Sequence, residues 1–101
     1  MRVAIVDDSI SDRNILTTLL PDCLSEIGFQ VACLDCYLNG EDFLATFHPG
    51  QYDIIFLDIY MNGLNGIETA RSIREADTDA KIIFITTSND FAAESYSVRA
   101  D

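Results

Sequence analysis

Residues 54–58 read Ile-Ile-Phe-Leu-Asp, an apolar run that ends in an acid. A short run without polar alternation is typical of a β-strand that is buried on both faces of its sheet. Two other runs have the same form, at residues 3–6, which lead into Asp7 and Asp8, and at residues 81–85, which lead into Thr86. The sequence therefore predicts several buried strands that end in polar side chains.

Segments with apolar residues at helical spacing separate these runs. The spacing predicts the following helices: about 12–27 with a kink or break at Pro21, a short one opened by residues 39–42 and running to about Phe47, about 67–76, and a last one from Asn89-Asp90 towards Val98. A further strand is predicted over 29–37. Strands that alternate with helices favour an α/β fold, in which helices cover both faces of a parallel sheet. Ligands of such sheets bind at the carboxyl ends of the strands.

Length and charge narrow the class of protein. The 101 residues, 49% of them apolar, fit one domain over residues 1–101. No apolar run approaches the roughly 18 residues of a membrane span, and the amino terminus reads as a strand, not as a signal peptide, so we expect a cytoplasmic protein. The net charge of −11 argues against direct binding of this chain to nucleic acids or anionic membranes.

The three cysteines, Cys23, Cys33 and Cys36, are an odd number in a chain without an export signal, so we expect reduced thiols. Cys33 and Cys36 form a Cys-x-x-Cys motif, but no second pair completes a zinc site. We expect all three to be small, buried or half-buried side chains.

If the strands predicted at residues 3–6 and 54–58 are neighbours in the sheet, Asp7, Asp8 and Asp58 converge at one edge. Three carboxylates this close require a cation, and hard oxygen ligands suit Mg²⁺ better than zinc. Asp58 is the best candidate for a nucleophile that accepts a phosphoryl group, with Thr86 as a hydrogen-bond donor to it. The plainer alternative is that these acids only end strands and cap helices, with Ser9 or Ser11 as the cap of the first helix.

The motifs together resemble the receiver domain of bacterial response regulators. They are Ile5-Val6-Asp7-Asp8, Ile55-Phe56-Leu57-Asp58-Ile59-Tyr60-Met61, Gly66 and Ile83-Phe84-Ile85-Thr86. The resemblance implies a flavodoxin-like, doubly wound parallel sheet with strand order 2-1-3-4. It also implies that a sensor histidine kinase phosphorylates Asp58. Mg²⁺, or Mn²⁺ in its place, would be contacted by Asp8, Asp58 and the backbone carbonyl of Tyr60, with Asp7 acting mainly through water, and Thr86 and Thr87 would contact the phosphoryl group as switch residues.

The stretch from Ile82 to Ala92 is similar to receivers that are joined to LytTR-type DNA-binding domains. This similarity implies that DNA is reached only through an output domain outside this chain, and that the chain takes part in transcription regulation. The domain would be a signalling switch that assists its own phosphorylation and dephosphorylation, and not a turnover enzyme. The alternative is a receiver-like interaction or dimerisation module that has lost phosphorylation. A Mg²⁺-dependent phosphatase is a weaker option, because no Asp-x-Asp follows a strand.

Two features depart from the family pattern. Asn62 stands where proline is common, and the sequence ends at Asp101, before the fifth strand, its lysine, its switch aromatic and the fifth helix. The only lysine, Lys81, opens its strand and is expected about five residues, or roughly 16 Å, from the site at the far end. We therefore expect strand 82–85 to be an apolar sheet edge that pairs with another chain, giving a homodimer or an element-exchanged oligomer.

Overall fold

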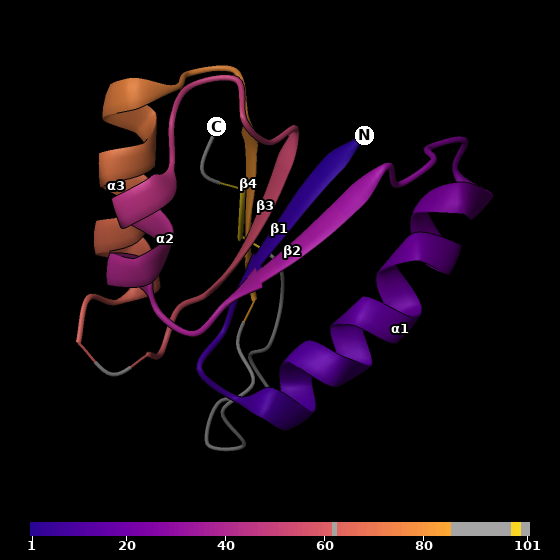
Figure 1. Ribbon diagram of the computed structural model, residues 1–101, viewed down its shortest axis with the longest axis horizontal. Coiled ribbons are helices and arrows are strands. Elements are labelled where there is room, and N and C mark those ends of the chain that lie inside the picture. Colours follow the sequence, from indigo (N-terminus) through magenta and orange to yellow (C-terminus); the bar gives the residue numbers. More distant parts are fainter. Residues whose placement is uncertain (62, 86–97, 100–101) are drawn as a thin grey trace.

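A five-stranded sheet forms the centre of the protein, as the computed structural model shows for residues 1–61, 63–85 and 98–99. The strands are β1 (Arg2–Val6), β2 (Cys33–Tyr37), β3 (Ile54–Asp58), β4 (Lys81–Ile85) and β5 (Val98–Arg99). Their order across the sheet is β2-β1-β3-β4-β5, with the first four parallel and β5 antiparallel to β4 (Figure 1). The predicted α/β fold and the strand order 2-1-3-4 are confirmed.

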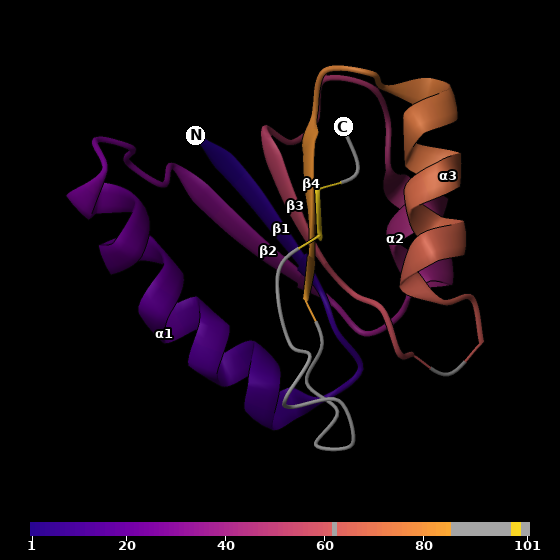
Figure 2. The same ribbon diagram turned by 180° about the vertical axis from the view of Figure 1, so that it is seen from behind.

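Helices cover both faces of the sheet. α1 (Ile10–Glu26) lies on one face, and α2 (Gly40–Thr46) and α3 (Gly66–Ala76) lie side by side on the other (Figures 1 and 2). Each helix begins after a polar side chain that accepts a hydrogen bond from the first turn, and these caps are Ser9, Asn39 and Asn65. The expected helices 39–47 and 67–76 therefore agree with α2 and α3 to within a residue or two.

Of the kink or break predicted at Pro21, the structure excludes the break. α1 begins at Ile10 and continues through Pro21 to Glu26, so the helix does not break there. Proline lacks the amide that would bond to the carbonyl of Thr17, which is the reason for expecting a break. The other backbone hydrogen bonds of this 17-residue helix keep it continuous although the bond from residue 21 to Thr17 is absent.

The second strand is shorter than predicted, because residues 28–29 close α1 instead of entering the sheet. The amide of Gly28 donates to the carbonyl of Ser25, and the amide of Phe29 donates to the carbonyl of Leu24 at 2.8 Å. Gly28 has a φ of 92°, which is typical of the residue that ends a helix. The amide of Ala32 then donates to the carbonyl of Met1, and the register of β2 with β1 begins with Cys33 opposite Arg2.

The hydrophobic core has two layers, one on each side of the sheet. Alternate side chains of β1 face opposite layers, as expected for a strand whose residues 3–6 are all buried. One layer, beneath α2 and α3, includes Val6, Leu57, Phe43 and Ile73. The other, beneath α1, includes Val3, Ile5, Leu24 and Phe56. Side chains therefore pack against β1 and β3 on both faces of the sheet. This packing holds Asp7 and Asp58, at the ends of these strands, in place.

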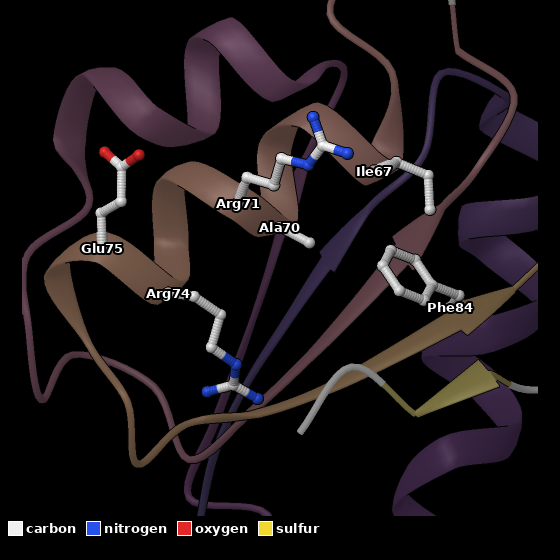
Figure 3. A pocket seen from close by; sticks show the side chains of 6 residues that line it. All are labelled: Ile67, Ala70, Arg71, Arg74, Glu75 and Phe84. Carbon is white, nitrogen blue, oxygen red and sulfur yellow. The ribbon is translucent and has the colours of Figure 1, made fainter.

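The β4 strand is not a free edge along its whole length. Ile83 pairs with Arg99 and Phe84 pairs with Val98, so the expectation of an unpaired edge is wrong at these positions. Val98 belongs to a strand, whereas the rest of the helix expected from Asn89-Asp90 lies outside the described residues. Beside β4, a groove of about 530 Å³ separates it from α3 (Figure 3). The groove is lined by Ile67, Ala70, Arg71, Arg74, Glu75 and Phe84.

The three cysteines are free thiols, as predicted. Cys33 is half-buried, but Cys23 and Cys36 are exposed, so their expected burial is wrong. Cys36 lies on β2, which has a neighbouring strand on one side only among the strands that the structure describes. None of the helices in the part of the chain that the structure describes could span a bilayer.

Candidate functional site

Three acidic side chains meet at the carboxyl ends of the two central strands. Val6 pairs with Leu57, so Asp7 and Asp58, the next residue of each strand, lie side by side. Asp7, Asp8 and Asp58 each place a carboxylate oxygen within 4.8 Å of the other two. This arrangement confirms the predicted convergence of the acids, which strand-ending and helix-capping roles alone do not require.

Asp7 is fully buried, and three of its four polar atoms are held by hydrogen bonds within the domain. Its amide donates to the carbonyl of Tyr37 at 3.1 Å, and its Oδ1 accepts from the amide of Ser9 at 2.9 Å. Its carbonyl oxygen accepts from Nη1 of Arg13 at 2.6 Å. The remaining atom, Oδ2, is buried and has no hydrogen-bond partner among the described residues. A buried carboxylate oxygen without a partner is costly, unless a ligand such as a cation or its water binds there.

Asp58 is also buried, with 1% of its surface exposed. Its Oδ1 accepts a hydrogen bond from the amide of Tyr60 at 3.1 Å. The intervening amide, of Ile59, donates to the carbonyl of Ile85 on β4, and the carbonyl of Ile59 accepts from the amide of Gly66. The backbone that follows Asp58 is thus tied to β4 and to the start of α3.

The electrostatics of the site favour the binding of a cation. Burial, together with the negative charges of Asp7 and Asp8, raises the pKa of Asp58 to about 7, against the lowering effect of the Tyr60 amide. Burial likewise raises the pKa of Asp7, while the Ser9 amide lowers it. A divalent cation beside these groups would remove the repulsion and favour their ionised forms.

The donor set fits Mg²⁺ or a similar hard cation. It offers two buried carboxylates and the exposed carboxylate of Asp8, with one buried oxygen that is free for a ligand. Carboxylate and carbonyl oxygens with room for water are the ligands that Mg²⁺ prefers. The amide of Tyr60 donates to Asp58, so the Tyr60 backbone lies next to the site, and Tyr60 is 49% exposed.

Other predicted residues fall elsewhere. Thr86, Thr87 and Asn62 lie outside the described residues. Lys81 pairs with Ile54 at the amino end of β4, whereas Ile85 at the carboxyl end pairs with Asp58. The prediction that Lys81 lies at the opposite end of the sheet from the acids is confirmed.

Sequence reasoning missed Arg13, which contacts the site through the carbonyl of Asp7. Its position one helical turn after the cap, Ser9, was the available signal. Side chains in the first turns of a helix lie back over its amino terminus, so an arginine there can reach the preceding strand.

The comparisons with known proteins agree with this geometry. The response regulator receiver domain matches residues 3–101. The probable transcriptional regulator ycf27 of Guillardia theta is 40% identical over 91 residues, which are 90% of this chain and 33% of that protein. The transcriptional regulatory protein LytR of Staphylococcus aureus is 34% identical over 100 residues, which are 99% of this chain and 39% of that protein. The chain thus spans only about a third of the length of these relatives.

Solved structures show the same fold. The response regulator TrrA of Thermotoga maritima, in complex with Mg²⁺-BeF, is 36% identical with a TM-score of 0.65, and the match covers 92% of this chain and 75% of that one. A chain in the complex of the histidine kinase ThkA with TrrA also matches, with 38% identity and a TM-score of 0.61. This match covers 85% of the present chain and 68% of the matched chain. Fold, acidic site and sequence agree, and the chain belongs to the receiver domains of two-component response regulators.

Proposed function

We propose that this domain is a phosphorylation switch in which Asp58 accepts a phosphoryl group from a sensor histidine kinase. The observation that supports this proposal best is the buried Asp58 carboxylate, within 4.8 Å of two other carboxylates at the ligand-binding edge of the sheet. The complex of the similar regulator TrrA with a histidine kinase supports the choice of partner.

The chain would hold Mg²⁺, or Mn²⁺, with Asp7, Asp8, Asp58 and the backbone carbonyl of Tyr60, with Asp7 acting mainly through water. When bound, the cation supplies positive charge that offsets the charge of the incoming phosphoryl group. Two observations support this assignment: Oδ2 of Asp7 is buried without a hydrogen-bond partner among the described residues, and the similar regulator TrrA forms a complex with Mg²⁺-BeF.

Asp58 itself would act as the nucleophile. The Tyr60 amide holds Oδ1, which leaves Oδ2 to form the bond to phosphorus while the bond from phosphorus to the donor breaks. Burial of Asp58 limits the access of water to the product. Thr86 and Thr87 follow β4, beside the strand that Asp58 ends, and are proposed to contact the phosphoryl oxygens.

The domain would act as a switch rather than as a turnover enzyme, because the transferred group stays on its own side chain. Phosphorylation would shift the population between two conformations and so change a protein interface or an attached output domain. The transcriptional regulators among the relatives support an output that acts on DNA through a further domain. The cytoplasm is the location that we propose for this switch.

The alternative function is an interaction module that has lost phosphorylation. The position of Lys81 favours this alternative, because the one lysine of the sequence lies at the end of β4 remote from Asp58. We also propose that the chain forms homodimers or exchanges elements with a second copy, since apolar side chains beside β3 and β4 line an open hollow of about 420 Å³.

Intact-mass spectrometry after incubation with acetyl phosphate tests the main proposal. We expect wild type to gain one phosphoryl group in the presence of Mg²⁺ and none after its removal. Asp58→Asn should gain none, whereas Asp53→Asn, the same change at the opposite end of β3, should behave as wild type. No gain by wild type, or an equal gain by Asp58→Asn, would contradict Asp58 as the acceptor and favour the interaction module.

A further inference from the structure

We propose that Arg13 is a positioning residue for the acidic site, which it orients through the peptide bond between Asp7 and Asp8. This inference rests on the proposed function, because it concerns the affinity of the site for Mg²⁺. Arg13 would touch neither the cation nor the phosphoryl group. It would act by fixing the backbone from which two of the three carboxylates project.

Arg13 connects the end of β1 to the first turn of α1. Its backbone amide donates to the carbonyl of Ser9 at 3.0 Å, within the helix. Its guanidinium reaches back and donates from Nη1 to the carbonyl of Asp7 at 2.6 Å. A short hydrogen bond from a charged donor in a half-buried place is stronger than a neutral one. The Arg13 side chain on α1 therefore holds the first residue of the turn over residues 7–9 by a hydrogen bond.

The accepting atom explains why this bond matters for the site. The carbonyl of Asp7 belongs to the same planar peptide unit as the amide of Asp8. A hydrogen bond that fixes the direction of the Asp7 carbonyl also fixes the orientation of the peptide plane between Asp7 and Asp8. The directions in which the two side chains leave the backbone are then restricted as well. The observed result is one buried carboxylate, Asp7, and one exposed carboxylate, Asp8, that both reach Asp58.

The guanidinium leaves the carboxylate of Asp7 available to a ligand. Oδ1 accepts from the Ser9 amide, and Oδ2 has no partner among the described residues. An arginine that paired with these oxygens would compete with a cation for them. Because Arg13 binds the carbonyl instead, it orders the site without filling it.

Positioning and simple charge effects predict opposite results when Arg13 is replaced. Loss of a positive charge near an acidic cluster should strengthen the binding of Mg²⁺, because one source of repulsion is removed. Loss of a positioning contact should weaken it, and groups that orient metal ligands typically contribute a factor of roughly 10 to 100 in affinity. The sign of the change therefore separates the two roles.

The experiment is a Mg²⁺ titration of wild type, Arg13→Gln, Arg13→Lys and Arg71→Gln, followed by amide chemical shifts. We expect Arg13→Gln to bind Mg²⁺ roughly 10-fold or more weakly than wild type. Arg13→Lys, which keeps the charge but loses the planar fork, should lie between the two. Arg71→Gln removes the same charge from an exposed site on α3 and should bind as wild type or slightly more tightly.

A second measurement needs no metal. Amide hydrogen exchange at Ser9, whose amide donates to Asp7, should accelerate in Arg13→Gln while residues 3–6 of β1 stay protected. If Arg13→Gln does not fold, Arg13→Lys provides both readouts. Mg²⁺ affinity equal to or above that of wild type in the folded Arg13 variants would overturn the positioning role alone. A wild-type chain that binds no Mg²⁺ would overturn the proposed metal site, and this role with it.

Discussion

Gly66 allows the first turn of α3 to lie against the carbonyl of Asp58. A Cβ atom at position 66 would overlap that carbonyl oxygen and would lie 2.9 Å from the Cα atom of Ile59. Both neighbours are backbone atoms, which cannot turn aside as the end of a side chain can. The absence of a side chain at Gly66 therefore sets how closely α3 approaches the residue proposed as the phosphoryl acceptor.

We predict that Gly66→Ala is destabilising, because overpacking against backbone typically costs about 1–3 kcal/mol. Urea unfolding of the metal-free protein measures this loss. Gly50→Ala is a suitable control, since nothing lies within 4 Å of its Cβ position and its φ of 81° adds only backbone strain of about 1–2 kcal/mol. Phosphorylation by acetyl phosphate should fall in Gly66→Ala and remain in Gly50→Ala. Unchanged phosphorylation of Gly66→Ala would show that the site tolerates a shift of α3.

The raised pKa of Asp58 predicts how stability depends on pH in the absence of metal. The folded protein holds this proton up to about pH 7, whereas the ordinary pKa of an aspartate is 3.8. The folded state binds the proton more tightly, so this contribution to stability is complete below about pH 4 and is lost as the pH rises through about 7. Asp58→Asn cannot ionise, and should therefore become increasingly more stable than wild type between pH 4 and pH 8.

Urea unfolding in the presence of a chelator, at several pH values, measures this difference. The slope per pH unit is at most about 1.4 kcal/mol for one proton. Asp53→Asn makes the same substitution at an exposed position next to the other end of β3, away from the acidic cluster, and serves as the matched comparison. A difference between Asp58→Asn and wild type that stays constant from pH 4 to pH 8 would contradict the raised pKa.

Much of the fold and of the acidic site was predictable from the sequence because one signal specified both. Apolar runs such as residues 3–6 and 54–57 are long enough only for buried strands, and the acid that follows each run must then lie at the sheet edge. The parallel order placed Asp7 and Asp58 side by side, as the structure confirms.

What the sequence could not predict depended on single hydrogen bonds. Phe29 has strong strand propensity, but its amide is used to close α1, so β2 begins later. Pro21 usually breaks a helix, yet the surrounding turns keep α1 continuous. The bond from Arg13 to the Asp7 carbonyl links a helix side chain to a strand end, and residue type alone does not indicate such a contact.

We predict that Mg²⁺ stabilises the wild-type domain, because the folded state gathers three carboxylates that the unfolded chain does not. At a concentration 100 times the Kd, the gain is about 2.7 kcal/mol. The effect should be large at pH 8 and small at pH 5, where protons compete for Asp7 and Asp58. Thermal unfolding with and without Mg²⁺ measures it, and Asp58→Asn should lose most of the gain. Equal gains in wild type and Asp58→Asn would place the cation elsewhere.

Self-association is the last prediction, and it concerns the apolar hollow that includes Phe29, Ile54 and Ile83. Phe29 is 47% exposed, so association with a second copy would remove apolar surface from water. The net charge of −11 opposes the approach of two copies, and added salt should therefore strengthen association by screening this repulsion.

Light scattering should show a mass that rises with protein and salt concentration. Phe29→Ser should reduce this rise, whereas Ile27→Ser, which removes a more exposed side chain outside the hollow, should not. A wild-type chain that stays monomeric at high protein and salt concentration would rule out association through this face.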